Sequence, residues 1–405
     1  MNTVPRHIRK DISDFFHQQR FLVLHFGDEG LRIYLLTYNS ETQKFVQKSS
    51  RFFKNVTEQN FHTTTLVRIV MHTAFFPFRY NIIMTVSHEH ALTRQHAIEL
   101  QRINPKNQIT AGEIESYFSH HIPNLIEKNK KITITKCDTD DLNVLLTQSA
   151  ITNIFVDKKC LHENQDDVFN QTGTRVHFDI VQTFVRRSIF MALTRILSKR
   201  GSIYAVYEDA VSLALSLYQR ALADNPKEVK PFLCVVIKET ATDVVAYNGT
   251  SIVFIDSFNF GYQSLYETLN AHLYIDRTSF MNIIKKLTEG AVSPKAKKYL
   301  EELLDQELSR LRNGIMSFKK STGIKTICID GGALDFYLQA DKKFQQALIA
   351  HEDISFVSGM EKELLHLPHK HTADIFTAIS VPRKNNIQGL GIKYIRWLIP
   401  HHMGN

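Results

Sequence analysis

The sequence predicts an α/β protein of two or more domains. Residues 232–247 hold two apolar runs around a polar turn, and residues 251–258 add a third, which predicts a three-stranded unit. Residues 326–333 are an apolar run that breaks at Gly331 and Gly332, as at the end of a buried strand. A chain of 405 residues exceeds one ordinary hydrophobic core, so we expect more than one domain.

The composition indicates a globular protein, and the cysteine pattern indicates a reducing compartment. Hydrophobic residues make up 43% of the chain and charged residues 22%. We find no apolar run of 18 residues and no apolar segment near the N-terminus, so we expect neither a transmembrane helix nor a signal peptide. The four cysteines form no C-x-x-C pair, which favours free thiols in the cytoplasm: Cys137, Cys160, Cys234 and Cys328.

The net charge of +8 does not by itself define a partner. It would fit a nucleic-acid binder, but the basic residues are scattered and no zinc-finger or RNA-binding signature accompanies them. His366, His369 and His371 cluster around Pro368, which prevents helical spacing of metal ligands. We therefore expect no nucleic acid and no metal site.

The first 90 residues favour strands. An apolar strand should end at Gly27, turn through Asp28 and Glu29, and return from Gly30. We expect strands at 21–26, 31–38, 44–48 and 80–86, and a helix at 61–75.

The segment that follows reads as a different unit of helices and strands. Thr110 and Glu113 form a capping box that opens a helix to about residue 126. Strands are expected at 131–136, 143–146, 151–157 and 174–180, followed by helices at 184–198 and 208–223.

The second half repeats the strand-rich pattern. After the three strands within 232–258 we expect helices at 265–272, just beyond 275, and at 294–318. A strand at 324–329 leads to the Gly331-Gly332 turn, and 354–357 and 372–379 read as a strand and a short helix. Residues 382–405 read as a tail.

This layout resembles the bacterial actin-like ATPase family, in its FtsA/PilM group. The most specific stretches are Val-Ser-His-Glu-His at 86–90, Arg-Ile-Asn-Pro at 102–105, Ile-Thr-Ala-Gly-Glu-Ile at 109–114 and Asn-Gln-Thr-Gly at 170–173, which are similar to the SHS2 subdomain of that group. The resemblance implies an actin-like (ribonuclease-H-like) two-domain fold with an inserted SHS2-like α+β subdomain. A ferredoxin-like insertion of another origin would give the same order of elements.

The resemblance also implies domain limits. The first actin-like domain would comprise 1–85 and 183–228, with the SHS2-like insertion at 86–182. The second actin-like domain would comprise 229–381, with a small helical subdomain near 265–318, and the tail 382–405.

The resemblance implies ATP and Mg²⁺ as cofactors, and it gives a set of candidate nucleotide-binding residues: Gly27, Thr240, Thr242, Asp243, Gly331, Gly332 and Ala333. The family's water-orienting acid would correspond to Glu208, with Asp209 in place of a usual proline. We assign no catalytic residue and no metal ligand.

Several substitutions argue against ordinary ATP chemistry. His25 replaces the acid of the first strand, and Asp28 and Glu29 lie where small polar residues are expected. A carboxylate about 4 Å from a phosphate costs on the order of 4 kcal/mol at an effective dielectric near 20. Lys238 and Glu239 replace glycines whose backbone N–H groups would cradle phosphate, and a lone turn lysine favours solvent. We expect ATP and Mg²⁺ to bind weakly or not at all.

These features predict a non-catalytic scaffold that recruits partners at the inner face of the plasma membrane, in cell division or type IV pilus assembly. The resemblance implies a tubulin-like division protein or a pilus-assembly inner-membrane protein as partner, and it is compatible with a homo-oligomer or filament. The alternative is an active ATP-dependent kinase or ATPase of the actin–hexokinase superfamily, with Asp243 or Asp330 as base.

The tail contains a candidate membrane-binding helix. Apolar residues recur at helical spacing near its end and include the only tryptophan: Ile392, Ile395, Trp397 and Ile399. Lys393 and Arg396 lie elsewhere on the helical wheel. Packing of the same residues against the protein body is the alternative.

Overall fold

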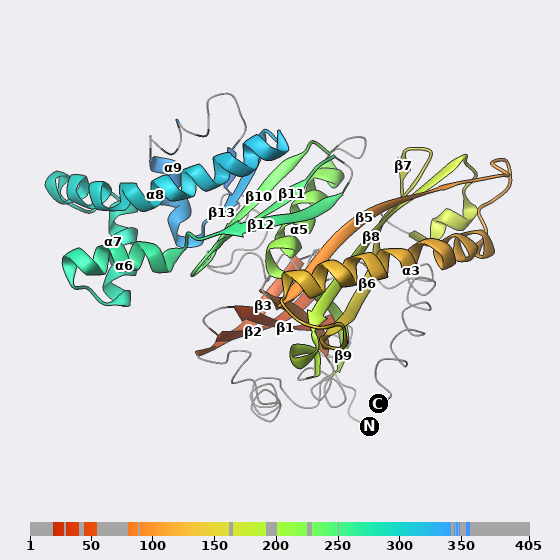
Figure 1. Ribbon diagram of the computed structural model, residues 1–405, viewed down its shortest axis with the longest axis horizontal. Coiled ribbons are helices and arrows are strands. Elements are labelled where there is room, and N and C mark those ends of the chain that lie inside the picture. The colour runs from red at the N-terminus through yellow and green to blue at the C-terminus, as the bar shows by residue number, and fades with distance from the viewer. Residues whose placement is uncertain are drawn as a thin grey trace, which may run out of the picture.

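The strands of the described part of the chain form three sheets (Figure 1). The computed structural model describes residues 19–27, 30–39, 44–54, 80–87, 90–161, 165–191, 201–224, 229–249, 251–341, 344, 346, 348 and 354–356. The predicted helices at 61–75 and 372–379 and the whole tail, including Ile392, Ile395, Trp397 and Ile399, lie outside these residues.

The first sheet has the strand order β3-β2-β1-β4-β9. An antiparallel meander is followed by two strands parallel to its first strand. The strands are β1 (Gln19–Gly27), β2 (Gly30–Asn39), β3 (Lys44–Lys54), β4 (Tyr80–Val86) and β9 (Gly201–Glu208).

The second sheet repeats this topology with the order β12-β11-β10-β13-β14. Its meander is again antiparallel, and its last two strands run parallel to the first. The strands are β10 (Phe232–Ile237), β11 (Thr242–Tyr247), β12 (Ile252–Phe258), β13 (Thr326–Asp330) and β14 (Ile354–Phe356). Sheets with parallel and antiparallel strands, covered by helices, confirm the predicted α/β class. The same sheet topology occurs twice in the chain.

Helix α5 (Asp209–Asp224) lies between the two sheets (Figure 1). Apolar residues occupy nearly every side of its first three turns, which is the pattern of a helix buried all round. Val211 and Leu215 share one core with Val23 of β1 and with Val236 and Val245 of the second sheet. The two sheets are therefore joined through this helix.

The insertion between β4 and β9 is an antiparallel sheet of order β5-β8-β6-β7. Helix α3 (Ala111–Lys136) packs on one face through Ile114, Phe118, Ile122 and Ile126. The other elements are β5 (Ala91–Gln101), η1 (Asp141–Asn143), β6 (Val144–Val156), β7 (Lys159–Cys160), η2 (Gln165–Asn170) and β8 (Arg175–Arg186).

The structure corrects several predicted element bounds in this part of the chain. The helix does not end near residue 126, and the predicted strand 131–136 is its last part. The β-branched run there favours a strand locally, but burial of Asn129 and Thr133 against the sheet continues the helix. The predicted strands 143–146 and 151–157 form the single strand β6, and β8 continues to Arg186, where a helix was expected to have begun.

Thr110 is the N-cap of α3, as predicted, and its Oγ1 accepts the N–H of Glu113 at 3.2 Å. The side chain of Glu113 does not complete a capping box, because it accepts both Nε and Nη2 of the buried Arg102.

A helical subdomain covers the opposite face of the second sheet from α5. It contains α6 (Tyr262–Leu273), α7 (Arg277–Thr288) and α8 (Pro294–Thr322), with η3 (Gly332–Leu334) and α9 (Asp335–Ala340) beside it. Asp276 caps α7, Ser293 caps α8, and Gly323 ends α8 in a left-handed conformation. The predicted helix starts just beyond 275 and at 294 agree with the structure, whereas α8 continues to Thr322, beyond the predicted end at 318.

Gly314 gives a stability test of this packing. A Cβ at Gly314 would lie 2.5 Å from the Phe258 ring of β12, whereas a Cβ at Gly112 of α3 would meet nothing within 4 Å. Glycine to alanine in a helix normally gains up to about 1 kcal/mol. We expect Gly314→Ala instead to lower the free energy of unfolding by roughly 1 kcal/mol, since overpacking costs about 1–3 kcal/mol.

Urea unfolding followed by circular dichroism measures both variants, with Gly112→Ala as the matched control that should be neutral or stabilising. Equal gains in the two variants would contradict the close packing of α8 on β12.

Candidate functional site

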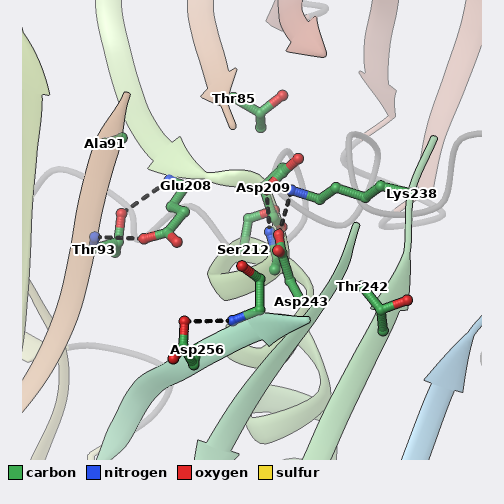
Figure 2. Close-up of polar contacts among 12 residues, drawn as sticks. Thr85, Ala91, Thr93, Glu208, Asp209, Ser212, Lys238, Thr242, Asp243 and Asp256 are labelled. Carbon is green, nitrogen blue, oxygen red and sulfur yellow. Dashed lines mark hydrogen bonds and ion pairs between the residues drawn. The ribbon is translucent and has the colours of Figure 1, made fainter. Parts of the chain in front are cut away.

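The candidate site lies where the first sheet, α5 and the β10–β11 turn meet (Figure 2). Glu208 is the last residue of β9 and Asp209 the first of α5. Carboxyl ends of parallel strands are the usual ligand-binding edge of α/β sheets. Glu208 and Asp209 are both buried, so their charges need partners.

Lys238 connects Asp209 to Asp243. Its Nζ donates to Asp209 Oδ1 at 2.7 Å and forms an ion pair with Asp243 Oδ2 (Figure 2). The Lys238 side chain is 13% exposed and Asp243 is fully buried. Burial lowers the pKa of Lys238, but the two carboxylates outweigh burial and raise it above the usual value. Lys238 is therefore charged at neutral pH.

The expectation that Lys238 faces solvent is wrong. It was based on the turn alone, whereas Asp209 comes from the start of α5, 29 residues earlier in the chain. The carboxylate that buries this lysine therefore lies outside the local sequence.

The β10–β11 turn is covered by the start of α6. The N–H groups of Tyr262 and Gln263 donate to the carbonyls of Lys238 and Glu239 at 3.0 and 2.8 Å. A Cβ at Gly261 would lie 2.4 Å from the Glu239 carbonyl, so glycine permits this approach. The helix N–H groups that could bind an anion are thus used within the protein.

Arg277 fixes the side of the same turn. Its guanidinium forms an ion pair with Glu239 and donates to Gln263 Oε1 at 2.6 Å. Arg277 also lies over the rings of Tyr266 and Phe280. Lys238 and Glu239 therefore both have charge partners on other elements, Asp209 and Asp243 for Lys238 and Arg277 for Glu239.

The glycine turn after β13 faces Tyr262. The Tyr262 hydroxyl donates to the Gly331 carbonyl, and the Gly331 N–H donates to Asp335 Oδ1 at 2.7 Å. Gly332 has a φ of +51°, and a Cβ there would lie 2.9 Å from the Tyr262 hydroxyl. Tyr262 therefore lies against the glycine turn that contains the candidate nucleotide-binding residues Gly331 and Gly332. Ala333 is part of η3, and the placement of its side chain is outside the described structure.

The other predicted nucleotide residues are only partly brought together. The Thr242 hydroxyl is buried and donates to the Phe260 carbonyl at 2.8 Å, and Thr240 is exposed. Gly27 ends β1 opposite Gly30, while Asp28 and Glu29 lie outside the described residues. His25, in place of the acid, has its Nδ1 2.8 Å from Thr85 Oγ1.

Glu208 has both carboxylate oxygens engaged. Oε2 accepts the N–H of Thr93 at 3.0 Å, and Oε1 accepts Lys136 Nζ at 3.0 Å. Burial raises the pKa of Glu208, and Lys136 opposes this effect. Because Lys136 belongs to α3 and Thr93 to β5, Glu208 connects the first sheet to the insertion instead of facing an open cleft. No signal in the sequence paired Glu208 with Lys136.

Within the described residues, we find no group of three or more His, Cys, Asp or Glu side chains that could hold a metal ion. No helix in that part of the chain is long and apolar enough to cross a membrane.

The repeated sheet topology and the site between the sheets define an actin-like α/β protein. No protein-family model matches the sequence, and no curated protein matches it. Among solved structures, the PilM-PilN type IV pilus biogenesis complex is similar at 12% identity and a TM-score of 0.53, over 89% of this chain and 98% of that chain. This likeness shows the fold.

Two further solved structures are similar at lower scores. A Bacteroides thetaiotaomicron protein with an actin-like ATPase fold has 8% identity and a TM-score of 0.43, over 91% of this chain and 98% of that chain. MreB 5 of Spiroplasma citri bound to AMPPNP has 10% identity and a TM-score of 0.39, over 95% and 98%.

Replacing Lys238 by methionine tests the ion triad of Asp209, Lys238 and Asp243. Lys238→Met leaves two buried carboxylates without the lysine between them. We expect the free energy of unfolding at neutral pH to fall by about 3–5 kcal/mol, the typical cost of removing one partner of a buried ion pair. Chemical denaturation gives this value.

Lys297→Met on α8 is the control, because its pair with Glu301 is exposed and its loss should cost less than about 1 kcal/mol. The triple variant Asp209→Asn, Lys238→Met, Asp243→Asn carries no charge at the triad and should recover most of the loss. A triple variant as unstable as Lys238→Met would show that charge is not the cause.

Proposed function

We propose that this chain is a non-catalytic actin-fold scaffold that recruits protein partners at the cytoplasmic face of a membrane, in type IV pilus assembly or cell division. The observation that carries this proposal is the ion triad of Asp209, Lys238 and Asp243 at the junction of the two sheets. It occupies the place where the family's nucleotide phosphates would be expected.

The energetics of the triad disfavour a nucleotide. A triphosphate would bring several negative charges toward Asp209 and Asp243, both buried. Moving Lys238 onto the phosphates would leave those carboxylates unpaired, at a cost of about 3–5 kcal/mol. The N–H groups of α6 that could offset this cost by binding phosphate already donate to the carbonyls of Lys238 and Glu239.

The insertion supports a role in protein recruitment. It is attached to the end of β9 through the pair of Lys136 and Glu208, and to α5 through Tyr218, whose hydroxyl donates to Asp179 of β8 at 2.9 Å. A subdomain held at two points presents its outer surface in a fixed orientation. Its assignment as an SHS2-like subdomain at 86–182 is part of this proposal. The similar PilM structure is a complex with PilN, which favours a protein partner in pilus assembly.

Titration with Mg-ATP tests the nucleotide half of the proposal. We expect calorimetry to detect no saturable binding at ATP concentrations up to about 1 mM, an affinity equivalent to about −4 kcal/mol. The reason is that the phosphate-facing groups are already paired within the protein.

Micromolar binding with turnover would instead favour the ATP-dependent kinase or ATPase alternative. In that case Lys238→Met should weaken binding, while the exposed Lys230→Met, two residues before β10, should not. This pair of variants would show whether ATP binds beside Lys238.

Trp397 tests the membrane half of the proposal. If residues 390–399 form an interfacial helix, Trp397 fluorescence should shift to the blue on adding anionic vesicles, because its ring enters the headgroup boundary. Trp397 is the only tryptophan, so the signal has one source. Lys393 and Arg396 should each contribute about 1 kcal/mol near an anionic surface.

Neutral vesicles, and the double variant Lys393→Gln, Arg396→Gln with anionic vesicles, should both give a smaller shift. An emission that is already blue without lipid and unchanged by it would mean that the tail packs on the protein, and would end the membrane proposal.

A further inference from the structure

The strands at the ends of the three sheets differ in how their outer edges are covered. An uncovered edge presents N–H and C=O groups with which another extended chain can pair. Strands β7 and β14 are only two and three residues long, β5 lies against β12, and β9 lies beside β6 and β8. Strand β3 is also a terminal strand, but it has 11 residues, and no described strand pairs with its outer edge.

Strand β12 occupies the same position in the second sheet that β3 occupies in the first. It is covered within the protein, because it lies against β5 of the insertion and its last residue, Phe258, packs against Phe318 of α8. On β3, by contrast, the side chains of Lys48, Arg51 and Phe52 are exposed. Of two equivalent edges in the repeated topology, one is therefore used inside the protein and the other has an exposed surface.

The β3 edge is basic along its whole length. The strand contains four cations and no Asp or Glu: Lys44, Lys48, Arg51 and Lys54. The two strands beside it, β2 and β1, also contain no carboxylate. Lys48 and Arg51 form no ion pair with any described residue, and the carboxylates nearest to β3 in the sequence, Glu41 and Glu58, lie outside the described residues. The edge therefore combines positive charge with available backbone groups.

Phe52 adds an apolar contact to this edge. Its side chain is 44% exposed, and among the exposed large hydrophobic residues of the described structure it alone lies on a strand. Arg32 is opposite Phe52 in the β2–β3 register, and its guanidinium lies 4.8 Å from the centre of the ring. A strand added beyond β3 would place a side chain next to this ring, and aromatic side chains stabilise strand pairs in this way.

We propose that β3 binds an acidic, extended segment of a partner protein as an added strand of the first sheet. Backbone hydrogen bonds at an open edge give affinity for an extended chain of any sequence. Carboxylates of the segment pair with Lys48 and Arg51, which gives the preference for an acidic sequence. This inference rests on the scaffold function proposed above and deepens it, because it names the kind of partner.

The charge of β3 also disfavours a second copy of the chain as the occupant. Lysines on an edge strand are a common protection against edge-to-edge association. Two β3 strands side by side would bring the four cations of each copy together, with no carboxylate from either strand between them. The same residues that prevent self-pairing attract a strand of opposite charge, so the edge selects an acidic partner.

The experiment titrates a fluorescently labelled peptide with full-length protein and measures fluorescence polarisation. The peptide alternates Glu and Val over about eight residues, the length of an ordinary strand. We expect saturable binding that weakens as salt is added. A Lys–Val peptide reverses the charge, and a Glu–Pro peptide keeps the charge but loses backbone donors and strand geometry. Both should bind at least about tenfold more weakly.

Charge reversal on the protein locates the site. The double variant Lys48→Glu, Arg51→Glu should weaken binding of the Glu–Val peptide by about tenfold or more. The matched control is Lys297→Glu, Lys298→Glu, which changes the net charge equally at exposed side chains of α8 and should leave binding unchanged. Bound peptide should also slow the amide hydrogen exchange of residues 44–54, as expected for a newly paired edge.

No saturable binding, equal binding of the Glu–Val and Glu–Pro peptides, or equal losses in the two double variants would overturn the proposal. Displacement of the peptide by a single-stranded oligonucleotide of higher affinity would also overturn it, and would assign the edge to nucleic acid. The assay contains neither ATP nor lipid. Its failure would therefore remove the β3 surface without altering the outcomes of the Mg-ATP and vesicle tests of the scaffold proposal.

Discussion

Two consecutive buried carboxylates at the end of β9 determine how the sheets are connected. Glu208 and Asp209 cannot be buried as charges without partners, and each has a lysine from a different part of the chain. Lys136 comes from the helix of the insertion, and Lys238 from the turn of the second sheet. Neutralising two adjacent charges therefore brings the first sheet, the second sheet and the insertion to one point.

Helix α5 extends this connection into the core. Its apolar residues pack between the two sheets, and Tyr218, about 15 Å along the helix from Glu208 at 1.5 Å per residue, donates to Asp179 of the insertion. Asp179 also accepts hydrogen bonds from Asn153 and His177, and the Asp179 hydrogen bond raises the pKa of His177. Rotation of one sheet about this helix, the usual motion of a two-domain fold, would have to break buried polar contacts at several points.

The sequence predicted the elements whose signals are local. The strands β1, β4, β10 and β11 and the starts of α7 and α8 follow from apolar runs, turns and helix-start signals within a few positions. The sequence-based predictions were wrong where a residue far away in the chain determines the local structure or burial. The end of α3 depends on the sheet beneath Asn129, and the burial of Lys238 depends on Asp209. The pair of Lys136 and Glu208 joins residues 72 positions apart. Charge pairs of this kind leave no periodicity in a single sequence.

The candidate nucleotide site comprises the β10–β11 turn, the start of α6 and the Gly331-Gly332 turn. The groups that we propose would face a phosphate have partners inside the protein: the α6 N–H groups bind turn carbonyls, Lys238 binds two carboxylates, and the Tyr262 hydroxyl donates to the glycine turn. A nucleotide would have to exchange one set of contacts for another, so we expect its net binding free energy to be small.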